Sequence, residues 1–199
     1  MLELWLIRHG MTEGNRFGRY IGTTDEPLCE EGRQFLEKMD YPMPEALYVS
    51  PMRRCMETAQ ILFPDKRIHI IEELAECDFG DFENRNYKEL SGNPDYQAWI
   101  DSGGTLPFPG GESREEFRKR SLRGFQKAVA GCIRQGVSRG AVVVHGGTIM
   151  NIMEEYADTY RPFYEWHVKN GGGYQVKLDP KLWQKDRRQL VVCRAFLEG

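Results

Sequence analysis

Two histidines of this chain each follow an apolar segment and are followed at once by glycine. His9 stands between Arg8 and Gly10 after the first apolar run, and His145 stands before Gly146 after a later one. An imidazole can act as a nucleophile or a base near neutral pH. An arginine fork fits phosphate or carboxylate, and glycine lets the backbone come close to a ligand. The two segments therefore indicate chemistry on an anionic group.

Two further segments place polar side chains after apolar runs. Arg53 and Arg54 come shortly after the run at residues 46–49, and Glu76 follows the run at residues 68–74. In an open α/β sheet, ligands bind at the carboxyl ends of the strands. The second histidine also precedes an expected helix, whose free N–H groups and positive dipole end favour an anion. If these strands share a sheet, two imidazoles, the arginines and one carboxylate converge at one edge.

The apolar pattern predicts a chain in which strands alternate with helices. Continuous apolar runs are typical of parallel strands that are covered on both faces. A capping box at Ser113 opens a long helix whose apolar residues recur every three or four positions. In the first helix we take Phe35 and Met39 as buried residues. We expect strands at 2–8, 46–49, 68–74, 141–144, 174–178 and 190–196, the last two paired at a sheet edge, and helices at 30–39, 51–63, 87–90, 94–100, from 113 onward and at 146–156.

Composition limits the classes of protein that fit. The 199 residues suit one α/β domain with a substantial core. A net charge of −3 provides no general basic field for nucleic acid. Five unevenly spaced cysteines favour a reduced protein over a disulfide framework or a zinc site. Neither a signal peptide nor an apolar run of the ~18 residues that a membrane span needs is present. We expect a cytoplasmic protein that binds neither nucleic acid nor membrane, as a monomer or a homodimer.

Five motifs resemble, in order and spacing, those of the histidine phosphatase superfamily, also called the phosphoglycerate mutase-like family. The resemblance covers most of the chain and implies a three-layer α/β/α sandwich with a mostly parallel central sheet. It also implies a phosphohistidine intermediate that forms without a metal or another cofactor. The motifs are Leu6-Ile7-Arg8-His9-Gly10-x-Thr12-x-x-Asn15, Ser50-Pro51-Met52-x-Arg54, Leu74-x-Glu76-x-x-Phe79-Gly80-x-Phe82-Glu83, Pro109-Gly110-Gly111-Glu112-Ser113 and Val144-His145-Gly146-Gly147.

The resemblance also implies a role for each motif residue. His9 would be the nucleophile, and positive charge beside it would lower its pKa toward the neutral form that attacks. Glu76 would protonate the leaving oxygen and then deprotonate water, which requires a carboxyl with a raised pKa. The alternative for Glu76 is a solvated acidic segment, because other carboxylates lie between residues 72 and 83. Phosphoryl oxygens would be held by Arg8, Arg54 and His145, with further donors from Asn15 and the Gly146 backbone N–H, whereas Arg53 would lie on the outer surface.

Within the superfamily, residues 5–10, 18–22, 76–83 and 96–113 are similar to those of the α-ribazole phosphatases. The substrate would then be a small phosphate ester such as α-ribazole 5′-phosphate. A broad-specificity sugar phosphatase and a mutase-type phosphotransferase are the alternatives, although phosphoglycerate mutases usually carry a longer insertion than this chain has. A non-catalytic phospholigand-binding module would be indicated by the absence of His9 or Glu76, and both are present.

Residues 84–112 break the regular alternation with glycine and proline. We expect one domain over residues 1–199 in which this stretch is a cap-like excursion. A plain surface crossover is an equally open reading. Trp99 and the phenylalanines at 79 and 82 would be core residues or, in a cap, aromatic side chains that stack on a ring.

Overall fold

A six-stranded, mostly parallel sheet forms the centre of the computed structural model, which describes residues 1–198. The strand order is β3-β2-β4-β1-β5-β6, in which the first four strands run parallel and β5 runs antiparallel to both of its neighbours, β1 and β6. The expected edge pair of final strands is therefore confirmed. The strands are β1 (Leu2–Arg8), β2 (Ala46–Val49), β3 (Ile68–Ile70), β4 (Arg139–Val144), β5 (Val168–Leu178) and β6 (Val191–Glu198).

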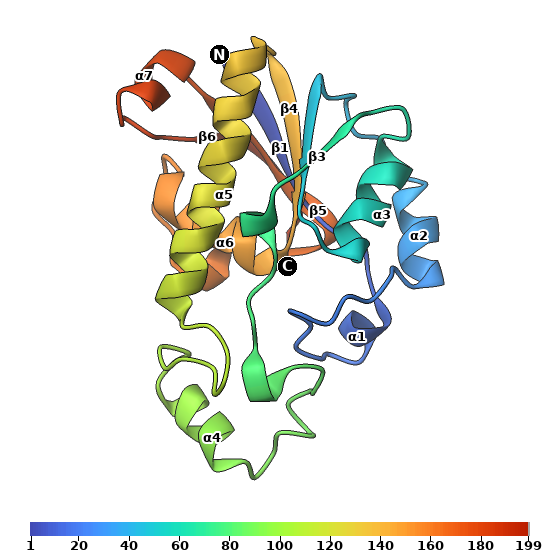
Figure 1. The fold of residues 1–199 in the computed structure, drawn as a ribbon, viewed down its shortest axis with the longest axis vertical. Coiled ribbons are helices and arrows are strands. Elements are labelled where there is room, and N and C mark those ends of the chain that lie inside the picture. The colour runs from blue at the N-terminus through green and yellow to red at the C-terminus, as the bar shows by residue number, and fades with distance from the viewer. Residues whose placement is uncertain (199) are drawn as a thin grey trace.

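Helices cover both faces of the sheet, so the three-layer α/β/α architecture is confirmed. In Figure 1, α5 and α6 lie on one side of the sheet and α2 and α3 lie on the other. The helices are α1 (Glu13–Arg16), α2 (Glu30–Leu36), α3 (Arg53–Leu62), α4 (Pro94–Asp101), α5 (Arg114–Gln135), α6 (Gly146–Tyr156) and α7 (Pro180–Gln184), with short 3-10 helices at η1 (Glu72–Leu74), η2 (Gly80–Phe82) and η3 (Phe163–Trp166). No helix within residues 1–198 is long and apolar enough to cross a membrane.

Alternate residues of β1 feed two separate hydrophobic cores. Leu4 and Leu6 pack into the core under α5 and α6, whereas Trp5 and Ile7 pack into the core under α3. Side chains alternate between the two faces of a strand, so a strand covered on both faces must be apolar at every position. This burial on both faces places β1 in the middle of the sheet. The polar residues that follow the buried run, Arg8 and His9, then lie at the carboxyl end of the strand.

Helix α2 is shorter than the helix expected at residues 30–39, and it packs against the protein with a different face. Phe35 is 42% exposed, whereas Leu36 is 1% exposed, so the expectation that Phe35 is buried is wrong. A Cβ atom on Gly32 would lie 2.3 Å from the backbone oxygen of Met11, so the helix approaches its neighbour most closely at Gly32. Leu36, one turn further on, lies on that same face.

Two other expected elements differ. The third strand ends at Ile70, and the chain then forms the 3-10 helix η1 in place of a longer strand. Residues 87–90 form a turn and not a helix. The side chain of Asn86 accepts the N–H groups of Lys88 and Glu89, and its backbone carbonyl oxygen accepts that of Leu90, so the chain makes one helix-like turn that does not continue.

Residues 84–112 lie beyond the carboxyl end of the sheet, with α4 at the bottom of Figure 1. The interior of this segment is aromatic: the Trp99 ring centroid lies 5.2 Å from that of Phe108 and 6.1 Å from that of Tyr96. Tyr20, from the loop after α1, joins this cluster, and its hydroxyl lies 3.2 Å from that of Tyr96. The segment is therefore packed against the chain that leaves β1.

Candidate active site

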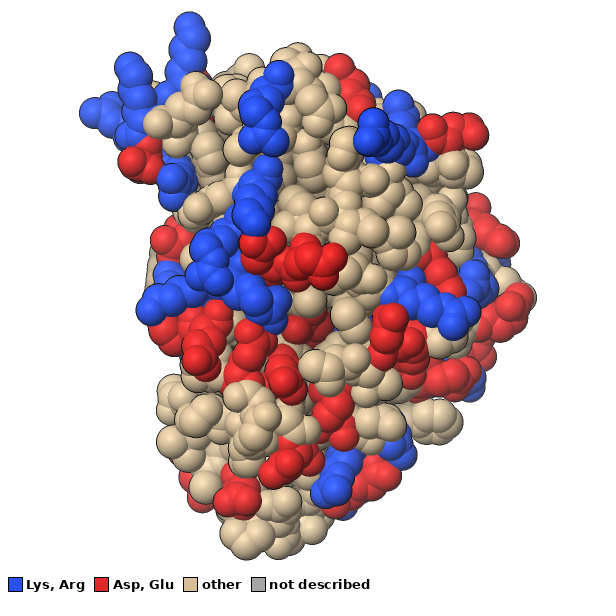
Figure 2. All heavy atoms as spheres, viewed as in Figure 1, with Lys and Arg blue, Asp and Glu red and all other residues tan. Residues whose placement is uncertain are grey.

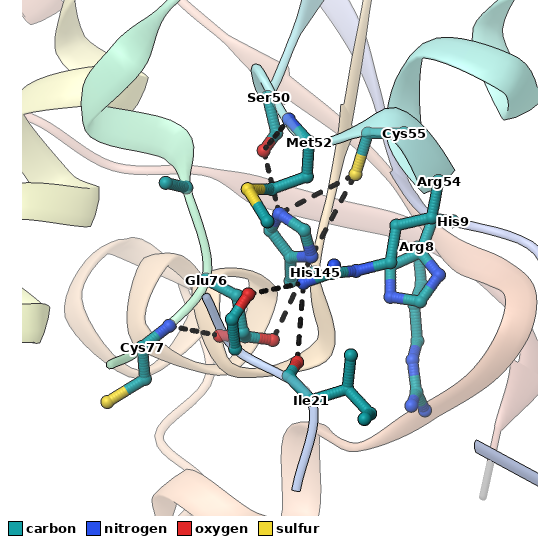
Figure 3. Close-up of polar contacts among 12 residues, drawn as sticks. Arg8, His9, Ile21, Ser50, Met52, Arg54, Cys55, Glu76, Cys77 and His145 are labelled. Carbon is teal, nitrogen blue, oxygen red and sulfur yellow. Dashed lines mark hydrogen bonds and ion pairs between the residues drawn. The ribbon is translucent and has the colours of Figure 1, made fainter. Parts of the chain in front are cut away.

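His9 and His145 each follow one of two hydrogen-bonded neighbouring strands. Arg8 of β1 is level with Val144 of β4, so each histidine is the first residue beyond its strand. Both side chains are buried, and their ring centroids lie 5.2 Å apart. Figure 3 shows the two rings in one region together with the side chains of Arg54 and Glu76. The structure thus brings both predicted imidazoles to one hollow at the carboxyl edge of the sheet.

The hydrogen bond of His9 defines which of its ring nitrogens can attack. Its Nδ1 lies 2.7 Å from the carbonyl oxygen of Gly10. A carbonyl only accepts, so Nδ1 carries the proton and the lone pair of the neutral ring is on Nε2. Burial, with the positive charges of Arg54 and Arg8, holds the pKa of His9 well below its usual value of 6.5. The imidazole is therefore in the uncharged, nucleophilic form.

His145 is held between a hydroxyl and a carboxyl. Its Nε2 lies 2.7 Å from the Ser50 hydroxyl oxygen, and its Nδ1 lies 4.0 Å from a carboxyl oxygen of Glu76. Burial, the Arg54 charge and the neighbouring His9 lower its pKa well below 6.5. Sequence analysis missed Ser50, although Ser50 directly follows β2 as His145 follows β4, and that shared position was the available signal.

Two guanidinium groups border the hollow, that of Arg54 buried and that of Arg8 partly buried. Arg54, at the start of α3, donates to the carbonyl oxygens of Thr24 at 2.9 Å and of Gly22 at 3.0 Å. Arg8 donates to the carbonyl oxygen of Val168 at 2.7 Å. The Nε atoms of both arginines are buried and have no hydrogen-bond partner within residues 1–198. Each arginine therefore keeps one N–H group that could donate a hydrogen bond to a phosphoryl oxygen.

The Glu76 carboxyl is mostly buried beside the hollow. Its side chain is 11% exposed, and desolvation raises its pKa above the usual 4.5 even though the Cys77 N–H donates to it at 2.9 Å. Glu73 instead pairs with Lys127, and Glu83 accepts the backbone N–H of Gly22 at 2.7 Å. A carboxyl with a raised pKa holds its proton to higher pH, which suits it to donate that proton to a leaving group.

Asn15 is linked through Asn170 to the backbone at His9, and Gly146 directly follows His145. The Asn15 amide oxygen accepts from the Thr12 N–H at 3.2 Å and from the Asn170 amide at 3.0 Å, so its NH₂ end is the one able to donate to a ligand. Gly146 begins α6, and a Cβ atom there would lie 3.4 Å from the Arg8 Nε. Its N–H is one of the free donors of the helix start.

β5 and the residue before it contribute polar groups that sequence analysis did not place in the site. Asn170 also donates to the carbonyl oxygen of His9 at 3.2 Å, and the His167 ring lies 3.2 Å from an Arg8 nitrogen. No local pattern marks these residues, which are separated from their partners by about 160 positions. Arg53 lies outside the hollow, as expected: its side chain is 58% exposed and pairs with Glu57.

A mostly aromatic cavity of about 220 Å³ lies beside Glu76. Gly147 borders it at the start of α6, and Arg114 of α5 supplies its one basic side chain. The aromatic residues that line it are Tyr20, Phe79, Trp99, Phe108, Phe117, Phe163 and Tyr164. An apolar pocket with few polar groups, next to convergent charged side chains, is a typical small-molecule site. Among residues 1–198, no group of three or more His, Cys, Asp and Glu side chains could hold a metal ion.

This sheet topology, with two buried histidines between arginines at its carboxyl edge, is that of an α/β protein that handles a phosphate-sized anion. Residues 4–190 match the model of the histidine phosphatase superfamily (branch 1). The chain belongs to that superfamily, and the resemblance seen in its motifs is confirmed.

Similar proteins include enzymes of more than one activity. An adenosylcobalamin/alpha-ribazole phosphatase of Salmonella typhimurium is 31% identical over 130 residues, which are 61% of this chain and 64% of that protein. A 2,3-bisphosphoglycerate-dependent phosphoglycerate mutase of Rhizobium etli is 30% identical over 77% of this chain and 79% of its own length. The crystal structure of the alpha-ribazole phosphatase from Shigella flexneri has the same fold, with a TM-score of 0.81 at 24% identity over 99% of this chain and 96% of that one.

Proposed function

We propose that this protein is a metal-independent phosphomonoesterase that hydrolyses a small phosphate ester through a phosphohistidine intermediate on His9. The observation that carries the proposal is the state of this imidazole. It is buried and neutral, its Nδ1 proton is bound to a carbonyl, and its ring lies 5.2 Å from the ring of His145. Two guanidinium groups beside it supply the positive charge that a phosphate dianion needs.

In the first step, the Nε2 lone pair of His9 attacks phosphorus and the ester P–O bond breaks. The developing charge on the phosphoryl oxygens is met by Arg8, Arg54 and His145, with neutral donors from Asn15 and the Gly146 N–H. The protonated carboxyl of Glu76 gives its proton to the leaving oxygen. Its raised pKa supports this assignment.

In the second step, water attacks the phosphohistidine. The Glu76 carboxylate left by the first step accepts a proton from that water, the P–N bond breaks, and His9 regains its neutral lone pair. Inorganic phosphate then leaves and Glu76 is again protonated. One carboxyl therefore serves as acid and then as base, as in other two-step displacements.

We infer that the leaving group carries a flat ring and that α-ribazole 5′-phosphate is a substrate. The aromatic cavity beside Glu76 supports this inference, because the ester oxygen of a bound substrate has to face that carboxyl. The relative named as an alpha-ribazole phosphatase supports it too. Residues 84–112, which supply Trp99 and Phe108, would act as the cap over this ring. A screen of α-ribazole 5′-phosphate against ribose 5-phosphate and 3-phosphoglycerate tests the inference, and equal kcat/KM values would contradict it.

The proposal is tested with p-nitrophenyl phosphate in the presence of a chelator. The wild-type protein should release phosphate and form an acid-labile phosphoenzyme, and His9→Ala should abolish both. His69→Ala is the control, because His69 lies on β3 and stacks on Tyr48 away from the hollow. Phosphate binding without a phosphoenzyme would identify a phospholigand-binding module instead.

A phosphotransferase of the mutase type is the second candidate, because one relative is named as such a mutase. A mutase must return its phosphoryl group to a second substrate and protect the phosphohistidine from water. Conversion of 3-phosphoglycerate should therefore be measured with and without a bisphosphate primer. Primer-dependent isomerisation that is faster than phosphate release would favour the mutase.

We also propose that the protein acts in the cytoplasm. Its five cysteines are all free and four of them are buried, which is typical of proteins from reducing compartments. Fractionation of cells that express the tagged full chain tests the proposal, and recovery from a secreted or membrane fraction would contradict it.

A further inference from the structure

The guanidinium group of Arg120, on α5, makes five hydrogen bonds to the segment that carries Glu76 and to one carboxylate. Nη1 donates to the carbonyl oxygens of Glu73 at 3.1 Å and Ala75 at 2.8 Å, and Nη2 donates to that of Glu76 at 3.0 Å. The remaining N–H groups bind the Glu112 carboxylate at 2.8 and 2.6 Å. A guanidinium has five N–H donors, so none is left for solvent.

Glu112 connects this group to the far side of Glu76. Its carboxylate accepts the Asp78 N–H at 3.1 Å, and its own backbone N–H donates to the Asp78 carbonyl at 2.9 Å. Residues 73–78, which we call the acid loop, are therefore fixed both before and after the proposed acid. Side chains of Arg120 and Glu112 are 21% and 22% exposed, which limits competition from water.

Other arginines of α5 do not make this kind of contact. Figure 2 shows basic side chains along α5 with acidic side chains beside them. Arg118 is typical of these: it pairs with the carboxylates of Glu155 and Glu115 at the surface. Surface pairs of this kind contribute little to stability. Among the arginines of α5, all within the described residues 1–198, Arg120 alone donates to three carbonyl oxygens of the acid loop.

We propose that Arg120 is a positioning residue for the acid step: with Glu112 as its counter-ion, it holds the acid loop so that the Glu76 carboxyl faces the leaving oxygen. The inference rests on the proposed phosphatase function. General acid catalysis depends on placement to within a fraction of an ångström. The Cys77 N–H fixes the Glu76 carboxyl locally, and the contacts of Arg120 and Glu112 tie the backbone on both sides of Glu76 to α5 and to residue 112.

Arg120 also acts on Glu76 through its charge. The charged groups facing Glu76 are Arg8 from β1, Arg54 from α3 and Arg120 from α5, and all three oppose the rise in its pKa that burial causes. The neighbouring His145 is neutral, since its own pKa is lowered. Removing the Arg120 charge should therefore raise the pKa of Glu76, because a carboxylate is less stable without a nearby cation.

The test compares Arg120→Met with Arg118→Met, which removes an arginine from the same helix without touching the acid loop. For each variant, kcat/KM is measured for ribose 5-phosphate, whose leaving group needs a proton, and for p-nitrophenyl phosphate, whose leaving group hardly does. We expect Arg120→Met to lose about 10- to 100-fold on the first substrate, because a misplacement of up to about 1 Å can lower a rate about 10²-fold, and less than about threefold on the second. The alkaline limb of its ribose 5-phosphate profile should move to higher pH.

A second measurement separates positioning from general damage. Arg120→Met is repeated in a Glu76→Gln background, where its effect on ribose 5-phosphate should disappear if it acts only through Glu76. If Arg120→Met does not fold, Arg120→Lys and Glu112→Gln take its place, and each should lower kcat/KM for ribose 5-phosphate more than that for p-nitrophenyl phosphate. Equal losses on both substrates, or a loss that persists without Glu76, would overturn the inference. Absence of any His9-dependent activity in the wild type would instead overturn the proposed function.

Discussion

Gly147→Ala tests the placement of Glu76 from the opposite side. Gly147 lies in the first turn of α6, and a Cβ atom there would lie 3.0 Å from a carboxyl oxygen of Glu76 and 2.9 Å from a ring carbon of Phe117. Non-bonded heavy atoms prefer separations of about 3.5 Å or more. Phe117 and Glu76 both border the aromatic cavity, and the Glu76 oxygen has to shift before an ordinary contact with that Cβ atom is reached.

The size of the effect follows from these distances. Restoring an ordinary contact displaces the Glu76 oxygen by about 0.5 Å. A misplacement of about 1 Å can lower a rate about 10²-fold, so half of that displacement should cost about tenfold in kcat/KM, or about 1.4 kcal/mol. Stability should change little, because the gain of about 0.5–1 kcal/mol from replacing a helical glycine offsets part of the packing strain.

The assay is the ratio of kcat/KM for ribose 5-phosphate to that for p-nitrophenyl phosphate, measured with the melting temperature. Gly147→Ala should lower the ratio about tenfold. Gly131→Ala is the control, because its Cβ would lie 2.0 Å from the Tyr48 hydroxyl oxygen, a tighter contact made on the part of α5 far from the hollow. It should lower the melting temperature and leave the ratio unchanged. An unchanged ratio in Gly147→Ala would refute the geometry described for the Glu76 carboxyl.

Three further predictions concern groups in the hollow. Glu76→Gln should lower kcat/KM for ribose 5-phosphate about 10²–10⁴-fold but hardly change that for p-nitrophenyl phosphate; equal losses would show that Glu76 is not the acid. In the pH profile of kcat/KM for ribose 5-phosphate, the rate should rise as His9 loses its proton, because the neutral ring attacks, and the pKa of His9 lies below its usual 6.5. The rate should fall as Glu76 loses its proton, because the protonated carboxyl is the acid, and the pKa of Glu76 lies above its usual 4.5. The falling limb should be absent in Glu76→Gln, and its persistence would assign that limb to another group. Ser50→Ala leaves the His145 Nε2 without its partner at 2.7 Å, and steady-state kinetics should show a loss of about 10-fold; wild-type activity would mean that the hydroxyl does not orient the ring.

Sequence patterns predicted the sheet and the strand-end residues because both depend on local signals. The continuous apolar runs of β1 and β4 indicated burial on both faces, and burial on both faces made them neighbours at the centre of the sheet. His9 and His145 were then brought together by strand register alone. The chemical roles assigned to these residues remain proposals until the variants are measured.

The residues that sequence analysis missed act over long separations or through small side chains. Asn170 comes from the glycine-containing first half of β5, which lacks the apolar alternation that indicates a strand. The face of α2 was misjudged because its closest contact is made by Gly32, which gives no hydrophobic signal. Arg120 was not singled out, because the sequence does not show that its partners are carbonyl oxygens.

Arg54 holds the backbone of a neighbouring loop as well as bordering the hollow. Its terminal nitrogens are bound to carbonyl oxygens of the loop at residues 21–24, and its side chain is fully buried. Replacing it would strand those oxygens without donors as well as remove a cation, and such orphaned groups cost about 1–3 kcal/mol each. If a variant without Arg54 is inactive, the cause could be a less stable fold or the loss of a cation from the site. The melting temperature has to be measured together with the kinetics to separate these two effects.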